Sequence, residues 1–373
     1  MEKVDIVIVG AGVVGLAIAS ELTRTGRQLF ILEKEKTYGQ GTSSRSSEVI
    51  HGGIYYPPNS LKAKLCVRGN TLLYRICQEN RIGHKKTGKI VVATNETEIK
   101  GIEQIMKQGK DSGARDLEMI DEDRIHQLEP NVKAVAAVYS PTTGILDTHG
   151  LMDHFHQEAK ANSSIDPLIL DTEVTGLKPT TDGYIVDMTS GGQPFSVEAR
   201  VVINSAGLYS DKIAAMVGLG IDKERYRIQW CKGDYFSLTG KPPCKMLVYP
   251  EPPKDGTSLG IHATPDLTGR IKFGPNAYYV KNIDYKVESD LEEFWKDIVK
   301  YLPSIRKEDL HPDMSGIRAK LQGPGDPFRD FVMRHEEDKG FPGFINLLGI
   351  ESPGLTCSPA IAEMISPMVT KIL

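Results

Sequence analysis

The sequence is poor in cysteine, and none of its cysteines has metal-binding spacing. Five cysteines are spread over 373 residues. No two of them form a CxxC pair, so neither a zinc site nor an iron–sulfur cluster is predicted. An odd, scattered set in so long a chain also argues against a disulfide framework. We therefore expect reduced thiols, no metal and a cytoplasmic location, with peripheral attachment to a membrane left open.

A basic excess and a long apolar run are missing as well. The formal net charge is −4, whereas nucleic-acid-binding proteins usually carry a basic excess. The apolar stretch 4–22 is interrupted by Asp5 and by several glycines, so neither a signal peptide nor a transmembrane segment is predicted. The rest of the composition is that of a globular protein, with 40% hydrophobic and 25% charged residues. This length suits two domains.

The N-terminus contains a dinucleotide-binding turn between an apolar strand and a helix. The strand is expected at 4–9 and the helix at 13–25. In this context Gly12 lets a pyrophosphate approach the backbone, and Gly15 lets the helix pack closely on the strand. The helix N-terminus offers N–H groups to the phosphates. The turn is Gly10-Ala11-Gly12-Val13-Val14-Gly15.

Glu33 ends a second expected strand at 28–32, next to Lys34. An acidic side chain at this place accepts hydrogen bonds from a ribose diol and repels a 2′-phosphate, so NADP is disfavoured. We count both Glu33 and Lys34 among the cofactor contacts. A glycine turn without a ligand ranks well below a dinucleotide-binding turn as an interpretation. NAD and FAD both remain open as the cofactor at this point.

A loop rich in glycine and serine follows at 39–53, where an NAD dehydrogenase would continue with regular βα units. Its first part supplies hydroxyls, backbone amides and one arginine, which suit phosphate, although a solvated loop is the simpler reading. In its second part His51 precedes consecutive glycines and aromatics, which suggests backbone close to a flat ligand. The candidate cofactor contacts are Thr42, Ser43, Ser44, Arg45, Ser46, Gly52, Gly53 and Ile54.

Four segments together resemble the D-amino-acid oxidase-type flavoproteins, and within them the L-2-hydroxyglutarate dehydrogenases and oxidases. These are GAGVVG at 10–15, SSRSSEVIHGGIYYPPNSLKAKLC at 43–66, NSAGLYSD at 204–211 and GIESPGLTCSPAIAEMI at 349–365. The resemblance implies an α/β chain with a glutathione-reductase-like, FAD-binding Rossmann domain. It also implies a second, α+β substrate domain with a mostly antiparallel sheet. The FAD domain is expected at 1–84, 146–222 and 316–373, and the substrate domain at 85–145 and 223–315.

The resemblance further implies which residues hold FAD, and we expect the binding to be noncovalent. Val174 would present its backbone to the adenine, and Ser205, Ala206 and Gly207 would lie near the pyrophosphate. A loop at 349–356 would surround the flavin ring, followed by a helix whose N-terminus faces negative charge on the reduced flavin. The contacts expected there are Gly349, Ser352, Pro353, Gly354, Leu355 and Thr356.

The implied activity is oxidation of an L-2-hydroxy acid, first of all L-2-hydroxyglutarate to 2-oxoglutarate, by hydride transfer to flavin N5. Such a reaction needs a base for the hydroxyl proton and cations for the carboxylates. We expect His51 to be the base or a flavin-orienting group, and His262 to be its substrate-binding partner or replacement. Arg318 is expected to bind a carboxylate. Weaker candidates for a second carboxylate are Lys64, Lys232 and Tyr249.

Two other functions remain open. An enzyme of the same fold could act on glycerol-3-phosphate or an amino acid, and Ser-Arg-Ser-Ser also resembles glycerol-3-phosphate dehydrogenases. A non-catalytic, FAD-binding redox sensor is the other possibility. The expected partners are a small-molecule carboxylate and an electron acceptor, which could be oxygen, a quinone or an electron-transfer protein.

Overall fold

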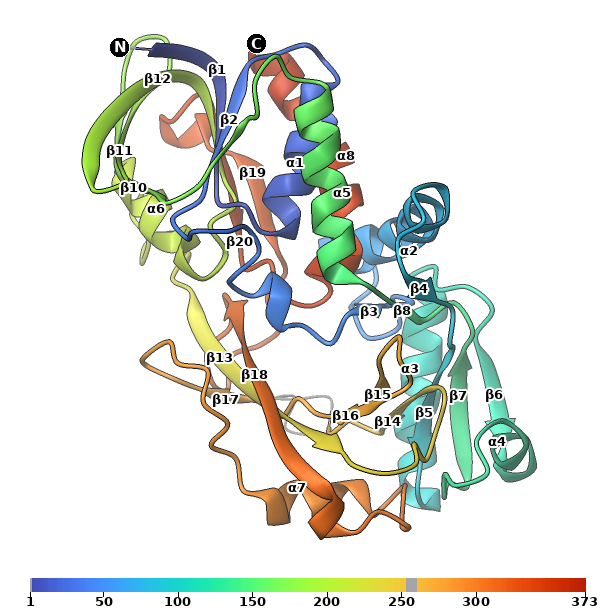
Figure 1. Cartoon of the computed structure of the whole chain (residues 1–373). Helices are drawn as coiled ribbons and strands as arrows, with labels where there is room; N and C mark the ends of the chain where they lie inside the picture. The colour runs from blue at the N-terminus through green and yellow to red at the C-terminus, as the bar shows by residue number, and fades with distance from the viewer. Residues whose placement is uncertain (1, 253–259) are drawn as a thin grey trace. The chain divides into compact units, whose positions relative to one another are not determined.

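The computed structural model describes residues 2–252 and 260–373, which fall into two compact units (Figure 1). Unit 1 comprises Met1–Ser44, Thr148–Gln229 and Ala319–Leu373, and unit 2 comprises Arg45–Asp147 and Trp230–Arg318. The expected domains differ mainly at 45–84, which fold within unit 2. One reason is strand pairing, since Val49–Ile50 and His84–Lys85 both pair with Gly144–Leu146. Residues 253–259, inside the region expected to alternate strands and turns, lie outside the described residues.

Unit 1 is built on an eight-stranded sheet with the order β10-β11-β12-β1-β2-β9, in which β20 pairs with β12 and β19 with β20. The central strand β1 runs parallel to both β2 and β12, as in a Rossmann domain. Its residues 6–9 are buried, which explains the unbroken apolar run. The strands are β1 Glu2–Val9, β2 Leu29–Leu32, β9 Leu168–Ile169, β10 Thr172–Pro179, β11 Tyr184–Ser190, β12 Gln193–Asn204, β19 Val332–His335 and β20 Phe344–Leu348.

Four α-helices complete unit 1: α1 Val13–Thr23, α5 Thr148–Ala161, α6 Ser210–Met216 and α8 Gly354–Ile372. Helix α1 packs against both α5 and α8 (Figure 1). The expected βαβ unit at the N-terminus is confirmed. The expected loop through Thr356 is wrong, because α8 already begins at Gly354 and includes Pro359 in its interior.

Unit 2 contains a nine-stranded sheet with the order β17-β13-β16-β15-β14-β5-β7-β6, and β18 pairs with β13. Most of its strand pairs are antiparallel, as expected, but β14 and β5 run parallel. The strands are β5 Lys89–Ala93, β6 Glu118–Asp121, β7 Ala136–Ser140, β13 Gln229–Leu238, β14 Leu247–Pro250, β15 Ala263–Pro265, β16 Ile271–Phe273, β17 Tyr278–Tyr279 and β18 Leu310–Lys320.

The described residues of unit 2 also form a small sheet and four α-helices. The small sheet has the order β3-β8-β4, with β3 Val49–Ile50, β8 Gly144–Leu146 and β4 His84–Lys85. The helices are α2 Leu61–Glu79, α3 Ile99–Asp111, α4 Glu122–Leu128 and α7 Leu291–Ile298. Strand β5 has a core on each side, because Ile90 and Val92 join one apolar cluster while Val91 and Ala93 join another.

Candidate functional site

The glycine turn of unit 1 has the geometry that a dinucleotide needs. Gly10 has φ +99°, which a residue with a side chain rarely adopts. A Cβ atom on Gly15 would lie 2.7 Å from Ser205 Oγ and would collide with the Gly10 carbonyl oxygen. The turn therefore requires glycine at both positions, and it leaves the N-terminus of α1 accessible at backbone level.

The Glu33 carboxylate is fixed at the end of β2 by two backbone donors. Ala11 N–H donates to Oε2 over 2.9 Å, and Glu35 N–H donates to Oε1 over 3.0 Å. Each carboxylate oxygen keeps acceptor capacity beyond these bonds. The donor set thus fits a ribose diol next to the glycine turn, and these residues fit FAD.

The hydroxyl-rich segment lies at the start of α1. Val13 N–H donates to Ser43 Oγ over 3.0 Å, so this hydroxyl occupies the helix N-terminus expected to face phosphate. Lys34 pairs with Glu35 at 3.5 Å, and its ammonium lies 3.8 Å from the centre of the Tyr209 ring. Thr42 and Ser44 belong to the same unit. Contact of these residues with the cofactor remains a prediction.

The other expected cofactor residues of unit 1 lie on three further segments of the chain. Ser205 Oγ donates to the carbonyls of Val9 and Gly10 over 2.9 and 3.1 Å, which fixes the segment at 205–207 against the glycine turn. Val174 lies on β10, the edge strand of the sheet. The backbone amides of Gly354, Leu355 and Thr356 form the first turn of α8. Gly349 adopts φ +69° beside Leu321.

In unit 2, Asn70 holds the backbone of the His51 loop. Its Nδ2 donates to the carbonyl of His51 over 3.0 Å and to that of Thr142 over 2.9 Å. A Cβ atom on Gly52 would lie 2.7 Å from Ser140 Oγ. The close approach made by Gly52 is therefore to the turn after β7, and contact of Gly52, Gly53 and Ile54 with a flavin remains a prediction.

Three aromatic side chains in unit 2 lie parallel to one another. The ring of Tyr249 is stacked on His262, with centroids 3.4 Å apart, and on Tyr55, with centroids 6.3 Å apart. The register explains the first pair, because Val248 lies opposite Ala263 in an antiparallel ladder. Tyr249 and His262 are consequently opposite each other as well. Both side chains are buried.

Lys89 lies against this stack and affects His51. Its Nζ is 4.4 Å from the centre of the Tyr249 ring and 4.7 Å from that of Tyr55. Burial, together with the charge of Lys89, lowers the pKa of His51 to about 3. Burial lowers the pKa of Lys89 itself to about 7. His51 is therefore neutral at physiological pH, and the lowered pKa makes it a weak base as long as it is buried beside the charged Lys89.

Arg318, on β18, has guanidinium donors available for a ligand. Its Nη2 donates to the Asn276 carbonyl over 3.1 Å, and its Nη1 lies 3.8 Å from Cys231 Sγ. A Cβ atom on Gly233 would be 3.1 Å from Nη1, so glycine at that position makes room for the guanidinium. Two of five N–H donors are accounted for, which leaves a fork able to bind a carboxylate.

Other basic candidates have different surroundings. The Arg45 guanidinium lies 3.8 Å above the Tyr285 ring. Lys232 is buried and pairs with Asp284 at 2.7 Å and with Glu288 at 3.2 Å. Lys64 is exposed on α2. Neither lysine is placed as a ready carboxylate ligand, since one ammonium is already neutralised and the other faces water.

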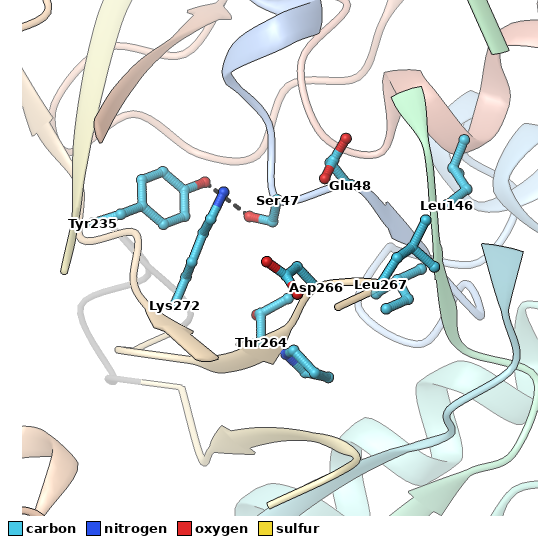
Figure 2. Close-up of a pocket in the computed structure, with 10 residues that line it drawn as sticks. Ser47, Glu48, Leu146, Tyr235, Thr264, Asp266, Leu267 and Lys272 are labelled. Atoms are coloured by element: carbon cyan, nitrogen blue, oxygen red, sulfur yellow. Dashed lines mark hydrogen bonds between the residues drawn. The ribbon is translucent and has the colours of Figure 1, made fainter. Parts of the chain in front are cut away.

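Unit 2 also contains a small pocket beside the aromatic stack, lined by both polar and apolar side chains (Figure 2). Tyr235 and Ser47 meet on one side of it through a hydrogen bond of 2.8 Å between their hydroxyls. Tyr235 and Thr264 both affect the pKa of Tyr249, which burial raises, so the pocket adjoins Tyr249. It is lined by Ser47, Glu48, Ile145, Leu146, Tyr235, Thr264, Pro265, Asp266, Leu267 and Lys272.

Comparison with known proteins identifies the class. Residues 5–368 match the DAO family of FAD dependent oxidoreductases, and the chain belongs to this family. It is therefore an FAD-dependent oxidoreductase, in agreement with the fit of the glycine turn and Glu33.

Named relatives make the likeness more specific. The chain is 40% identical to the mitochondrial L-2-hydroxyglutarate dehydrogenase of Arabidopsis thaliana, over 98% of this chain and 83% of the relative. It is 32% identical to the corresponding human protein, over 98% of this chain and 88% of the relative. Among solved structures, the FAD-bound L-alpha-glycerophosphate oxidase of Mycoplasma pneumoniae superimposes with a TM-score of 0.86 at 26% identity, covering 100% of this chain and 95% of that one.

The expected cytoplasmic location is wrong by this comparison. The L-2-hydroxyglutarate dehydrogenases that resemble the chain are named as mitochondrial proteins in plants and animals alike. Composition and cysteine usage could not have shown this, because reduced thiols are common to several compartments. Within the described part of the chain, no helix has both the length and the apolar character needed to cross a bilayer.

Lys89 and Asn70 were not recognised from the sequence. A signal for Lys89 was present, because this lysine opens the apolar strand KIVVA, in which all five residues are buried. Asn70 gave no such signal, since a polar residue in a partly exposed helix is ordinary.

Proposed function

We propose that this protein oxidises L-2-hydroxyglutarate to 2-oxoglutarate. The observation that carries the proposal is the Arg318 fork, which lies in the same unit as His51 and the buried His262–Tyr249 stack. A base and a cation are the groups that oxidation of a hydroxy acid requires. The resemblance of nearly the whole chain to L-2-hydroxyglutarate dehydrogenases supports the same substrate.

In this proposal unit 1 holds FAD and unit 2 holds the substrate. Glu33 accepts from the ribose diol, while the glycine turn and the segment at 205–207 hold the pyrophosphate. When bound, FAD supplies the acceptor for the hydride that leaves C2. Arg318 orients the C1 carboxylate through its fork, and an imidazole nitrogen of His51 takes the hydroxyl proton. His262 and Tyr249 form a rigid wall that orients the substrate.

A second candidate substrate is glycerol-3-phosphate. The structural likeness to the L-alpha-glycerophosphate oxidase favours it, as does the run of serines around Arg45. A phosphate dianion would also be bound by Arg318, so binding of an anion alone does not separate the two substrates. The difference lies at the far end of the substrate, which is a carboxylate in L-2-hydroxyglutarate.

Anaerobic bleaching of the flavin tests the proposal. The purified holoenzyme is mixed separately with L-2-hydroxyglutarate, D-2-hydroxyglutarate, glycerol-3-phosphate and a panel of amino acids. We expect rapid loss of the visible flavin absorbance with the L-hydroxy acid only. Bleaching by glycerol-3-phosphate instead would reject the substrate, and no bleaching by any compound would favour a non-catalytic role. Reoxidation by oxygen, a quinone and an electron-transfer protein then identifies the acceptor.

A further inference from the structure

Lys89 is a charged side chain at an apolar position. It opens β5, whose other residues all pack into the two cores of unit 2. Its side chain is 0% exposed. Within residues 2–252 and 260–373, Nζ has no hydrogen-bond partner. A buried ammonium with no acceptor for its three N–H groups is unfavourable, because it has lost its hydration.

The neighbours of Lys89 compensate for only part of this loss. The faces of Tyr55 and Tyr249 attract the cation, yet neither ring face accepts a strong hydrogen bond. Burial lowers the pKa of Lys89 to about 7, so that a neutral amine competes with the ammonium near physiological pH. Folding gains nothing from this arrangement, since an apolar side chain would suit the strand better. An anionic ligand would accept hydrogen bonds from the Lys89 ammonium and balance its charge.

The position of Lys89 links it to the groups already placed in the site. On β14, residues Leu247 and Tyr249 lie beside Lys89 and Val91 of β5, in parallel register. Side chains two residues apart point to the same face of a sheet, so Lys89 and Tyr249 share a face. Tyr249 is stacked on His262, and the charge of Lys89 acts on His51.

We propose that Lys89 Nζ binds the C5 carboxylate of the substrate and thereby makes the site selective for dicarboxylates. This rests on the proposed function, in which Arg318 binds the C1 carboxylate. A dianion with its charges at opposite ends needs two separate cations. Lys232 is already paired with two carboxylates and Lys64 is exposed on α2, whereas Lys89 Nζ is buried and has no hydrogen-bond partner among the described residues.

Binding at Lys89 would also affect the base. The positive charge of Lys89 disfavours a proton on His51 and contributes to the lowered pKa of that imidazole. A bound carboxylate neutralises this charge, and His51 becomes more basic when a dicarboxylate is present. A monocarboxylate bound only by Arg318 leaves Lys89 charged. His51 then stays less basic and accepts the hydroxyl proton less readily.

The test measures binding of two unreactive acids to the oxidised holoenzyme by titration calorimetry. Glutarate has both carboxylates, and butyrate lacks the second one. In Lys89→Met we expect the Kd for glutarate to rise on the order of 30-fold, the loss typical of removing one partner of a buried charge pair. The Kd for butyrate should change less than about threefold. Lys86→Met, an exposed lysine three positions away, serves as the matched control.

The outcomes separate this inference from the proposed function. Unchanged glutarate binding in Lys89→Met, or equal weakening of glutarate and butyrate, would overturn the role of Lys89 even if wild-type flavin is bleached by L-2-hydroxyglutarate. Failure of the wild type to bleach would reject the substrate, whatever Lys89 binds. If Lys89→Met does not fold, Lys89→Gln removes the charge with a polar side chain and gives the same comparison. Lys89→Arg, which keeps the charge, should retain most of the preference for glutarate.

Discussion

His262 and Tyr249 lie face to face, with ring centroids 3.4 Å apart and planes inclined by 8°. Tyr249 is on β14 and His262 directly precedes β15, so the pairing of Val248 with Ala263 holds the two side chains near each other. The ring of Tyr55 also lies nearly parallel to that of Tyr249, at an interplanar angle of 14°. The imidazole of His262 therefore has little freedom to rotate, and it can serve as a fixed wall for a small substrate.

Replacing Tyr249 should reveal how much this stack contributes. Tyr249→Phe keeps the ring, and we expect its rate of flavin reduction by L-2-hydroxyglutarate to stay within about threefold of the wild type. Tyr249→Leu loses the aromatic contact, worth roughly 0.5–1.5 kcal/mol, which corresponds to a rate about 2- to 12-fold lower if the stack orients the substrate. Stopped-flow absorbance measures both rates. Equal rates in Phe and Leu variants would show that the stack has no part in orientation.

The glycine turn gives a prediction about the cofactor. Gly15→Ala places a methyl group against the carbonyl of Gly10, in backbone that cannot move without displacing β1. We expect the variant to be purified with little or no FAD and to melt at a lower temperature. Gly41→Ala is the matched control, because a Cβ atom there meets no atom within 4 Å. Flavin content by absorbance decides the outcome, and full FAD occupancy in Gly15→Ala would contradict the assignment.

The sequence was sufficient for the parts of the fold that depend on local pattern. The run at 4–9, the GxGxxG turn and Glu33 predict a βαβ unit because each feature has a local cause, and the structure has that unit. The start of α8 was expected at Pro359, but the helix begins at Gly354 and includes Pro359 and Pro367 in its interior.

The group of candidate site residues in unit 2, namely His51, His262, Tyr249 and Lys89, could be predicted only in part. His51 and His262 were chosen because each lies near glycines; the structure stacks His262 on Tyr249 and brings His51 within the electrostatic influence of Lys89. The position of Lys89 next to Tyr249 depends on the pairing of β5 with β14, two strands far apart in the chain. No local pattern contains that register, so a sequence can reveal an unusual lysine but not its neighbours.

Cys357 bears on how FAD is attached. It lies in the first turns of α8 and is fully buried, with its N–H donating to the Pro353 carbonyl over 2.9 Å. We expect the flavin to be noncovalent, so acid precipitation should leave a yellow supernatant and a colourless pellet. Cys357→Ser should behave in the same way and retain its FAD. A pellet that stays yellow in the wild type but not in Cys357→Ser would demonstrate a covalent bond to this cysteine.

The pH dependence of catalysis should report the charge of Lys89. Its pKa is lowered to about 7, so the free enzyme carries the ammonium below this pH and the amine above it. The dicarboxylate needs the ammonium, and kcat/KM follows the ionisation of the free enzyme. We therefore expect kcat/KM for L-2-hydroxyglutarate to be level below pH 7 and to fall toward tenfold per pH unit above it.

The ionisable groups near Lys89 allow the decrease in kcat/KM above pH 7 to be assigned to this lysine. His51, with a pKa of about 3, is neutral on both sides of pH 7, and burial raises the pKa of Tyr55 and Tyr249 so that both stay neutral. Cys66 is the remaining group whose charge acts on Lys89. Lys89→Arg should abolish the fall between pH 7 and 9, because a guanidinium stays charged there, while Cys66→Ala should preserve it. A fall that persists in Lys89→Arg would mean that a different group titrates and that carboxylate binding does not depend on Lys89.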